Sequence, residues 1–127
     1  MNAKYLRQWW VLLVVLLFSY GVEARQPADG VRVGTIAVAS LPAEAQRTLL
    51  LIKQGGPFPN EKDGVVFGNY ERRLPKQARG YYHEYTVRTP GERSRGARRL
   101  IAGGQPMDAH EFYYTADHYA SFQRVAE

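Results

Sequence analysis

Glu84 has a residue type and a sequence position that suggest acid–base chemistry. It lies within Tyr81–Val87, a segment rich in aromatic and β-branched residues that is typical of a strand. Alternation along that strand would place Tyr82, Glu84 and Thr86 on one face. A carboxylate among aromatic rings is costly to bury unless it is paired. Glu84 is therefore either a solvated carboxylate on a half-exposed sheet or a general base held rigidly by the strand, and the segment alone leaves both open.

His118 is the second residue that could exchange a proton with a substrate. It stands in Asp117-His118-Tyr119, directly after an aromatic segment that we expect to be a strand. Histidine can donate a proton near neutral pH, and a neighbouring charge can tune that ability. A structural or surface histidine would give the same local pattern.

Four arginines occur among the seven residues from 93 to 99. Arg95 and Arg99 have the same parity, so an extended segment would direct both toward one side. The guanidinium group offers a planar fork of donors that matches phosphate oxygens. A turn at 89–91 would bring Glu84 and these arginines onto neighbouring strands. The alternative interpretation is a solvated basic edge.

A short loop, Phe67-Gly68-Asn69-Tyr70-Glu71, could read a nucleic-acid base. Gly68 and Asn69 tolerate unusual backbone angles and can expose backbone N–H groups. A carboxylate beside a tyrosine could accept hydrogen bonds from a base edge while the ring stacks on the base, as recognition of single-stranded RNA requires. Taken alone, the loop is equally consistent with an ordinary turn.

The bulk composition limits the classes of function. A chain of 127 residues is long enough for one small domain, and 17 Lys and Arg against 12 Asp and Glu favour a polyanionic partner. There is no cysteine, which excludes disulfides and thiolate metal sites. His83, His110 and His118 do not have the spacing of a zinc motif, so we expect neither a metal nor another cofactor.

The N-terminus has the pattern of a secretory signal peptide. Lys4 and Arg7 precede the uncharged apolar run Trp9–Phe18, and Val22-Glu23-Ala24 fits a cleavage site. The run is shorter than the roughly 20 residues that span a bilayer. We therefore expect residues 1–24 to be a signal peptide and the protein to be secreted, extracellular or periplasmic. An uncleaved signal anchor is the alternative.

The remaining pattern predicts an α+β fold with one N-terminal helix packed on a twisted antiparallel β-sheet. A helix over 41–53 is predicted by the stripe Ala45, Leu49 and Ile52, with Ser40 as its cap and Gly55 after its end. We expect a flexible leader over 25–40 and one domain over 41–127. The predicted strands are Val31–Val38, Val65–Phe67, Tyr81–Val87, Arg95–Ala102, Phe112–Thr115 and Tyr119–Val125.

Each of these signals is weak alone, but their order along the chain resembles the microbial guanyl-specific ribonucleases, the barnase-like extracellular family. The similarity is greatest to the Streptomyces branch and runs from Leu41 to Phe122. The blocks that carry it are Leu41-Pro42, Gly56–Pro59, Asp63–Glu71, Gly80–Val87, Thr89–Arg99 and Tyr113–Tyr119.

The resemblance implies a set of catalytic roles. Glu84 matches the general base that takes the proton from the ribose 2′-hydroxyl, and His118 matches the acid that protonates the leaving 5′-oxygen. Arg95 and Arg99 match the arginines that stabilise the charged transition state. The implied reaction is metal-free transesterification of RNA through a 2′,3′-cyclic phosphate.

The resemblance also implies how guanine is bound. Glu71 matches the carboxylate that accepts from guanine N1–H and the 2-amino group, and the backbone N–H groups of residues 68–70 would meet O6. Phe67 and Tyr119 match the residues that flank the base. Gly68 and Tyr70 depart from the Streptomyces branch, and Tyr70 would serve as a stacking lid.

The implied partners are single-stranded RNA and a small acidic inhibitor protein complementary to the basic site, with the enzyme a monomer. The competing hypotheses are a non-catalytic RNA-binding relative and a membrane-tethered toxin domain. Retention of the expected base, acid and arginines together argues against the first, because a mere binder has no use for both proton-transfer groups.

Overall fold

A computed structural model of the protein describes residues 31–127. The expected signal peptide over 1–24, and residues 25–30 of the expected leader, lie outside this part of the chain. The described elements are β1 (Gly34–Ala37), η1 (Val38–Ser40), α2 (Ala43–Gln54), β2 (Val65–Val66), β3 (Tyr82–Thr86), β4 (Arg99–Gly103), η2 (Pro106–Asp108), β5 (Glu111–Thr115) and β6 (Gln123–Ala126).

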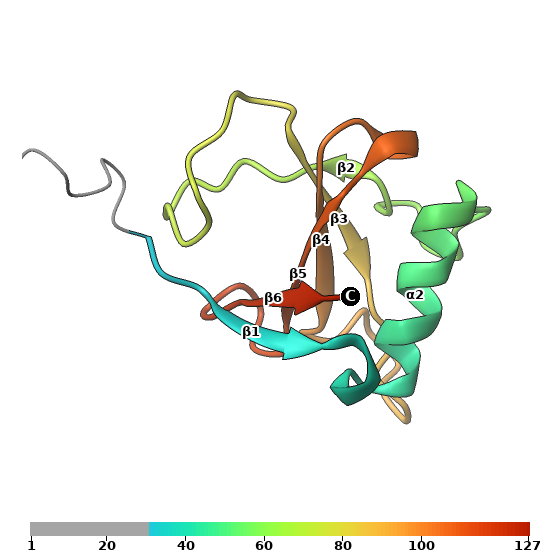
Figure 1. The fold of residues 1–127 in the computed structure, drawn as a ribbon. Helices are drawn as coiled ribbons and strands as arrows, with labels where there is room; N and C mark the ends of the chain where they lie inside the picture. The colour runs from blue at the N-terminus through green and yellow to red at the C-terminus, as the bar shows by residue number, and fades with distance from the viewer. Residues whose placement is uncertain (1–30) are drawn as a thin grey trace, which may run out of the picture. The chain divides into compact units, whose positions relative to one another are not determined.

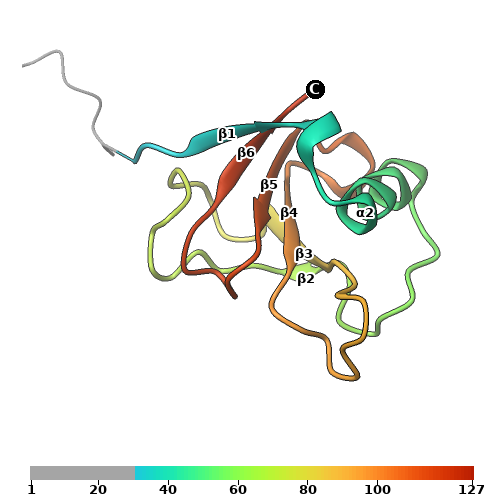
Figure 2. The same ribbon diagram turned by 90° about the horizontal axis from the view of Figure 1, so that it is seen from below.

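The strands of residues 31–127 form one sheet in the order β1-β6-β5-β4-β3-β2. The labelled strands can be followed in this order in Figure 2. All neighbours pair antiparallel except β1 and β6, which pair parallel. Helix α2 lies against one face of this sheet (Figure 1). The predicted α+β fold is confirmed, and the sheet is mixed rather than purely antiparallel because β1 joins its edge.

Helix α2 forms where the apolar stripe predicts it. Ala45, Leu49 and Ile52 are buried against the sheet, and Gly55 ends the helix in the left-handed conformation at φ 82°. The expected cap is wrong: Ser40 belongs to η1, and Pro42 occupies the N-cap position without a side-chain hydrogen bond.

The sheet has a separate apolar cluster on each face, and alternation along the strands divides their side chains between the two. The cluster between sheet and helix contains Leu41, Ala45, Leu49, Ile52, Tyr85, Val87, Leu100, Ala102, Phe112, Tyr114 and Val125. The other cluster contains Leu74, Tyr82, Ile101, Tyr113 and Phe122. Full burial of one large apolar side chain contributes about 1.5–3 kcal/mol to the stability of the fold. The second cluster supports the face that carries Glu84.

Three strands begin three or four residues later than predicted, whereas β2, β3 and β5 agree with the predictions to within one residue at each end. The first strand is confined to Gly34–Ala37, within the segment expected as a leader. The strand expected from Arg95 begins only at Arg99, because the chain turns at Gly96 with φ 68°. The last strand begins at Gln123 rather than at residue 119, which lies in a turn. Among residues 31–127, no helix is long and apolar enough to cross a membrane.

Candidate active site

Glu84 lies in the middle of β3, where it pairs with Ile101 of β4 and Val65 of β2. Its Oε2 accepts a short hydrogen bond from the Tyr119 hydroxyl. Burial raises the pKa of Tyr119 to about 12, and the hydrogen bond to Glu84 and the charge of Glu84 add to the effect. Tyr119 is therefore protonated at neutral pH and restrains the carboxylate.

Arg95 and Arg99 converge on Thr86, two residues along β3 from Glu84. Arg99 is the register partner of Thr86 on β4. The Nε and Nη2 atoms of Arg95 donate to Thr86 Oγ1 at 3.1 and 2.8 Å. The expected placement of both arginines on one extended strand is wrong, because Arg95 approaches from the loop before Gly96. A strand and a loop nevertheless bring both cations to Thr86, which lies on the same face of β3 as Glu84.

The guanidinium of Arg99 is buried, with 2% of the residue exposed. Its Nη1 donates to the carbonyl oxygens of Gly96 at 3.0 Å and Arg98 at 2.7 Å. Its Nε is buried without a hydrogen-bond partner in the described part of the chain. A buried cation is costly unless an anion or acceptor satisfies it. The unused donor of Arg99 thus favours an anionic ligand here.

His118 is exposed and stands in a left-handed turn. His118 and Tyr119 have φ values of 54° and 72°, a conformation that residues other than glycine adopt rarely. The His118 N–H donates to the carbonyl oxygen of Ala97 at 3.0 Å, and its ring centroid lies 4.8 Å from that of Tyr119. The His118 ring therefore lies beside Tyr119, whose hydroxyl donates to Glu84. Strained backbone of this kind is common at functional sites.

Asp117 holds that turn together rather than bonding to His118. It accepts from Ser121 N at 2.9 Å and Ser121 Oγ at 2.6 Å, and Thr115 Oγ1 donates to it at 2.9 Å. These bonds, those from Ser121 first, lower the pKa of Asp117 to about 2. Thr115 also accepts from Tyr119 N at 3.2 Å. Sequence reasoning missed Thr115, although its place at the end of β5 was a usable signal.

A pocket of about 100 Å³ lies beside Tyr119 and is called the base pocket below. The rings of Phe67 and Tyr119 form its apolar wall, with centroids 5.3 Å apart and planes at 24°. Glu71 stands at this pocket and forms an ion pair with Arg73 at 2.9 Å. The complete lining is Phe67, Asn69, Tyr70, Glu71, Arg73, Tyr119 and Phe122.

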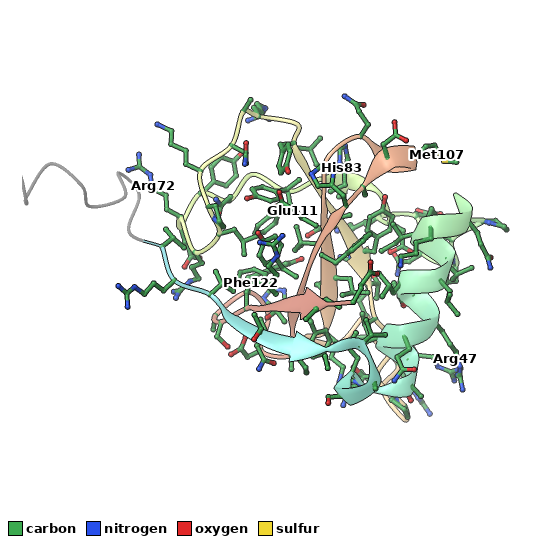
Figure 3. All side chains as sticks on the ribbon, viewed as in Figure 1. Arg47, Arg72, His83, Met107, Glu111 and Phe122 are labelled. Carbon is green, nitrogen blue, oxygen red and sulfur yellow. The ribbon has the colours of Figure 1, made fainter. Side chains whose placement is uncertain are left out.

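Of the predicted base-binding residues, the structure brings all but Gly68 to the base pocket. Gly68 lies beneath the ring of Tyr70, so that an added Cβ would come within 2.5 Å of that ring. Sequence reasoning missed Arg73 and Phe122. Arg73 has the parity of Glu71, which was the available signal, whereas Phe122 comes from the segment just before β6, about fifty residues further along the chain. Figure 3 labels Phe122 in the middle of the domain.

The loop that carries the base pocket is internally braced. Asn69 adopts φ 51°, its Nδ2 donates to the carbonyl oxygen of Leu74 at 2.9 Å, and its Oδ1 accepts from Leu74 N at 3.1 Å. Leu74 is fully buried in the cluster beneath the site. The loop is therefore anchored to the core. Within residues 31–127, no three His, Cys, Asp or Glu side chains gather where a metal ion could bind.

Comparison with known proteins shows which protein family the chain belongs to. Residues 24–126 match the ribonuclease family, and the chain belongs to that family. Guanyl-specific ribonuclease Sa3 of Kitasatospora aureofaciens is 59% identical over 93 residues, which cover 73% of this chain and 64% of Sa3. The chain thus spans slightly less than two thirds of Sa3.

More complete matches come from two further proteins. Guanyl-specific ribonuclease Sa of the same organism is 55% identical over 72% of this chain and 93% of Sa. The crystal structure of ribonuclease Sa2 with guanosine-2′-cyclophosphate has a TM-score of 0.68 and 48% identity, covering 75% of this chain and 97% of that one. The resemblance to microbial guanyl-specific ribonucleases is confirmed.

Proposed function

We propose that the protein is an endoribonuclease that cleaves single-stranded RNA on the 3′ side of guanosine, with a 2′,3′-cyclic phosphate as the first product. The observation that carries this proposal is the arrangement on one sheet face of Glu84, Arg99 and Tyr119 beside the base pocket. Relatives named as guanyl-specific ribonucleases support it.

In the proposed reaction, the carboxylate of Glu84 takes the proton from the ribose 2′-hydroxyl. The 2′-oxygen then attacks the adjacent phosphorus, and His118 gives a proton to the departing 5′-oxygen as the P–O5′ bond breaks. Water later opens the cyclic phosphate with the two roles reversed. RNA supplies its own nucleophile, so the step needs only a base, an acid and positive charge between them.

Arg95 and Arg99 supply that charge. The phosphate gains negative charge on its equatorial oxygens as the five-coordinate state forms, and pre-positioned cations stabilise this state without reorganising. The unpartnered Nε of Arg99 is a donor already oriented within the protein. Thr86 fixes Arg95, and Tyr119 fixes Glu84, so neither group has to be ordered by the substrate.

Guanine would bind in the base pocket. Glu71 would accept from N1–H and the 2-amino group, the backbone N–H groups of residues 68–70 would donate to O6, and the rings of Phe67 and Tyr119 would line the site. Adenine presents an acceptor at N1 and lacks the 2-amino group, so it would offer the Glu71 carboxylate no hydrogen-bond donor.

Cleavage of dinucleotides tests the proposal. The purified protein is incubated with GpC, ApC and UpC in EDTA, and the products are followed by chromatography. We expect cleavage of GpC alone, through a cyclic intermediate, and a rate for Glu84→Gln at least 100-fold lower with little change in substrate binding. Absence of cleavage of every dinucleotide would refute the enzyme, and inhibition by EDTA would refute the metal-free mechanism.

We also propose that the protein is exported, that residues 1–24 are removed, and that the mature enzyme is a monomer. Residues 25–127 carry 15 basic and 11 acidic residues. An acidic inhibitor protein complementary to this surface would protect the producing cell. Mass spectrometry of the exported protein tests processing: an N-terminus at Arg25 is expected, whereas an intact N-terminus would favour the membrane-tethered alternative.

A further inference from the structure

A second pocket, called the basic pocket below, lies across the Phe67–Tyr70 loop from Glu71. It has a volume of about 250 Å³ and shares Phe67, Asn69 and Tyr70 with the base pocket. The rest of its lining comes mainly from residues 72–79, and neither Glu71 nor Tyr119 belongs to it. The two pockets are therefore neighbours separated by the loop that would bind guanine.

The basic pocket is lined by three cationic side chains, Arg72, Lys76 and Arg79, and by no acidic residue. None of the three forms an ion pair with a carboxylate of residues 31–127, whereas the adjacent Arg73 is paired with Glu71. Three like charges around one hollow repel one another. An anion bound between them would relieve that repulsion and release counterions.

Tyr70 gives the basic pocket an aromatic surface. Its side chain is 81% exposed, its ring covers Gly68, and its hydroxyl accepts from Arg79 Nη1 at 3.2 Å. An exposed aromatic ring beside cations is the combination that binds single-stranded nucleic acid, because bases stack on the ring while the cations meet the phosphates.

The basic pocket has a fixed backbone on one side. Arg72 adopts the left-handed conformation at φ 56°, and its N–H donates to the carbonyl oxygen of Asn69 at 3.0 Å. The Asn69 side chain is bonded twice to Leu74, which is fully buried. Tyr82 lines the pocket, and its hydroxyl donates to the carbonyl oxygen of Pro75 at 2.6 Å.

We propose that the basic pocket binds the nucleotide that precedes the guanosine in the RNA chain, with its phosphate on Arg72 and Arg79 and its base on Tyr70. Tyr70 then stacks on this preceding base and does not serve as the lid over guanine that the resemblance implied. This inference rests on the proposed function, which puts the cleaved phosphate at Arg95 and Arg99. The strand on the 3′ side leaves from that phosphate. The strand on the 5′ side leaves guanosine away from that phosphate, and the proposal places it in the basic pocket because this pocket adjoins the base pocket.

Binding of uncleavable analogues tests the proposal independently of activity. A 2′-deoxyguanosine lacks the attacking hydroxyl, so titrations can compare dGpC, its 5′-extended form UpdGpC and its 3′-extended form dGpCpU. We expect UpdGpC to bind about tenfold more tightly than dGpC. The logarithm of its affinity should also fall more steeply with the logarithm of salt concentration, by about 0.7 for one additional phosphate contact. The 3′-extended dGpCpU should bind less than threefold more tightly than dGpC.

Three single variants, each lacking one positive charge, locate the effect. Arg72→Ser and Arg79→Ser should each reduce the gain from the 5′ uridine at least threefold and leave dGpC binding unchanged. Arg47→Ser is the matched control, since Arg47 projects from α2 on the opposite side of the described domain from Arg72 (Figure 3). Arg47→Ser should leave the gain intact.

Each outcome decides the matter. No gain from the 5′ uridine, a larger gain from the 3′ extension, or equal losses in Arg47→Ser and Arg72→Ser would overturn the proposal. Cleavage of GpC by the same samples reports the proposed function separately. An active enzyme without the 5′ gain would refute the basic pocket alone, and a 5′ gain in a protein that does not cleave GpC would refute catalysis alone.

Discussion

Replacing Tyr119 by phenylalanine removes one oxygen atom and leaves the ring that packs on Phe67 and Phe122. The lost interaction is the hydrogen bond from the hydroxyl to Glu84. A hydrogen bond to a charged group contributes about 1.5–3 kcal/mol, and water can replace part of this at a half-buried site. We expect unfolding free energy at pH 7 to fall by about 1 kcal/mol, which lowers Tm by about 4–8 °C in a domain of this size.

The same variant should reverse its effect at high pH. Burial, followed by the bond to Glu84 and the charge of Glu84, raises the pKa of Tyr119 from 10.0 to about 12. Folding therefore favours the neutral phenol, and that contribution is complete below pH 10 and lost as pH rises toward about 12. Each pKa unit corresponds to about 1.4 kcal/mol, and partial exposure reduces this to about 1 kcal/mol per pH unit. The phenylalanine variant has no such loss, so the free energies of unfolding of the wild type and Tyr119→Phe should be equal at about pH 11.

Urea denaturation between pH 7 and pH 11.5 measures the crossing, and cleavage of GpC measures the positioning role. We expect kcat to fall about tenfold, the equivalent of 1.4 kcal/mol, with KM changed less than twofold because the ring remains. Tyr70→Phe is the stability control, since its exposed hydroxyl contacts Arg79 rather than a carboxylate. A constant stability deficit of Tyr119→Phe from pH 7 to pH 11.5, or an unchanged kcat, would refute this reasoning.

Three further variants test the other parts of the site. Glu71→Ala should reduce the preference for GpC over ApC by about 100-fold, since two hydrogen bonds to a charged group are lost; equal kcat/KM ratios in variant and wild type would exclude Glu71 from base recognition. Arg99→Lys should lower kcat/KM for GpC about 100-fold because the ammonium group lacks the guanidinium fork; a loss below threefold would contradict a role in the transition state. Asp117→Asn should lower kcat roughly tenfold by loosening the turn that carries His118. Its Tm deficit at pH 7 should shrink as pH falls from about 4 toward 2, because the unfolded carboxylate is protonated first and the folded one, with its pKa of about 2, is half protonated at pH 2. A Tm deficit that is as large at pH 2 as at pH 7 would show that Asp117 does not act through its charge.

Local patterns predicted the parts of the fold that local forces determine. The stripe Ala45, Leu49 and Ile52 predicted α2 to within two residues of its observed start, because helical burial repeats every three to four residues. The alternation that put Tyr82 and Glu84 on one face was equally reliable, since the pleat leaves no other choice. Arg99 was expected on the strand beside Glu84 for the same reason, and it lies there.

Features that depend on distant contacts could not be predicted from local patterns. Arg95 reaches Thr86 only because Gly96 turns the chain. The left-handed backbone at His118 and Tyr119 contradicts the strand propensity of the segment. It is held because Tyr119 N donates to the Thr115 hydroxyl and His118 N donates to the Ala97 carbonyl oxygen, two acceptors from other segments. The parallel pairing of β1 with β6 joins residues about ninety positions apart, for which a single sequence carries no signal.

That parallel pairing also means that the sheet is complete only when the last of its described strands is present. Strand β6 lies between β1 and β5 in the sheet, although it is made last of all the described strands. A growing chain that has not passed residue 126 leaves β1 without its neighbour, and one that has not passed residue 122 lacks a wall of the base pocket as well. Contacts between such distant segments form late in folding. Any fragment of the protein that stops before residue 122 should therefore lack both the partner strand of β1 and one wall of the base pocket.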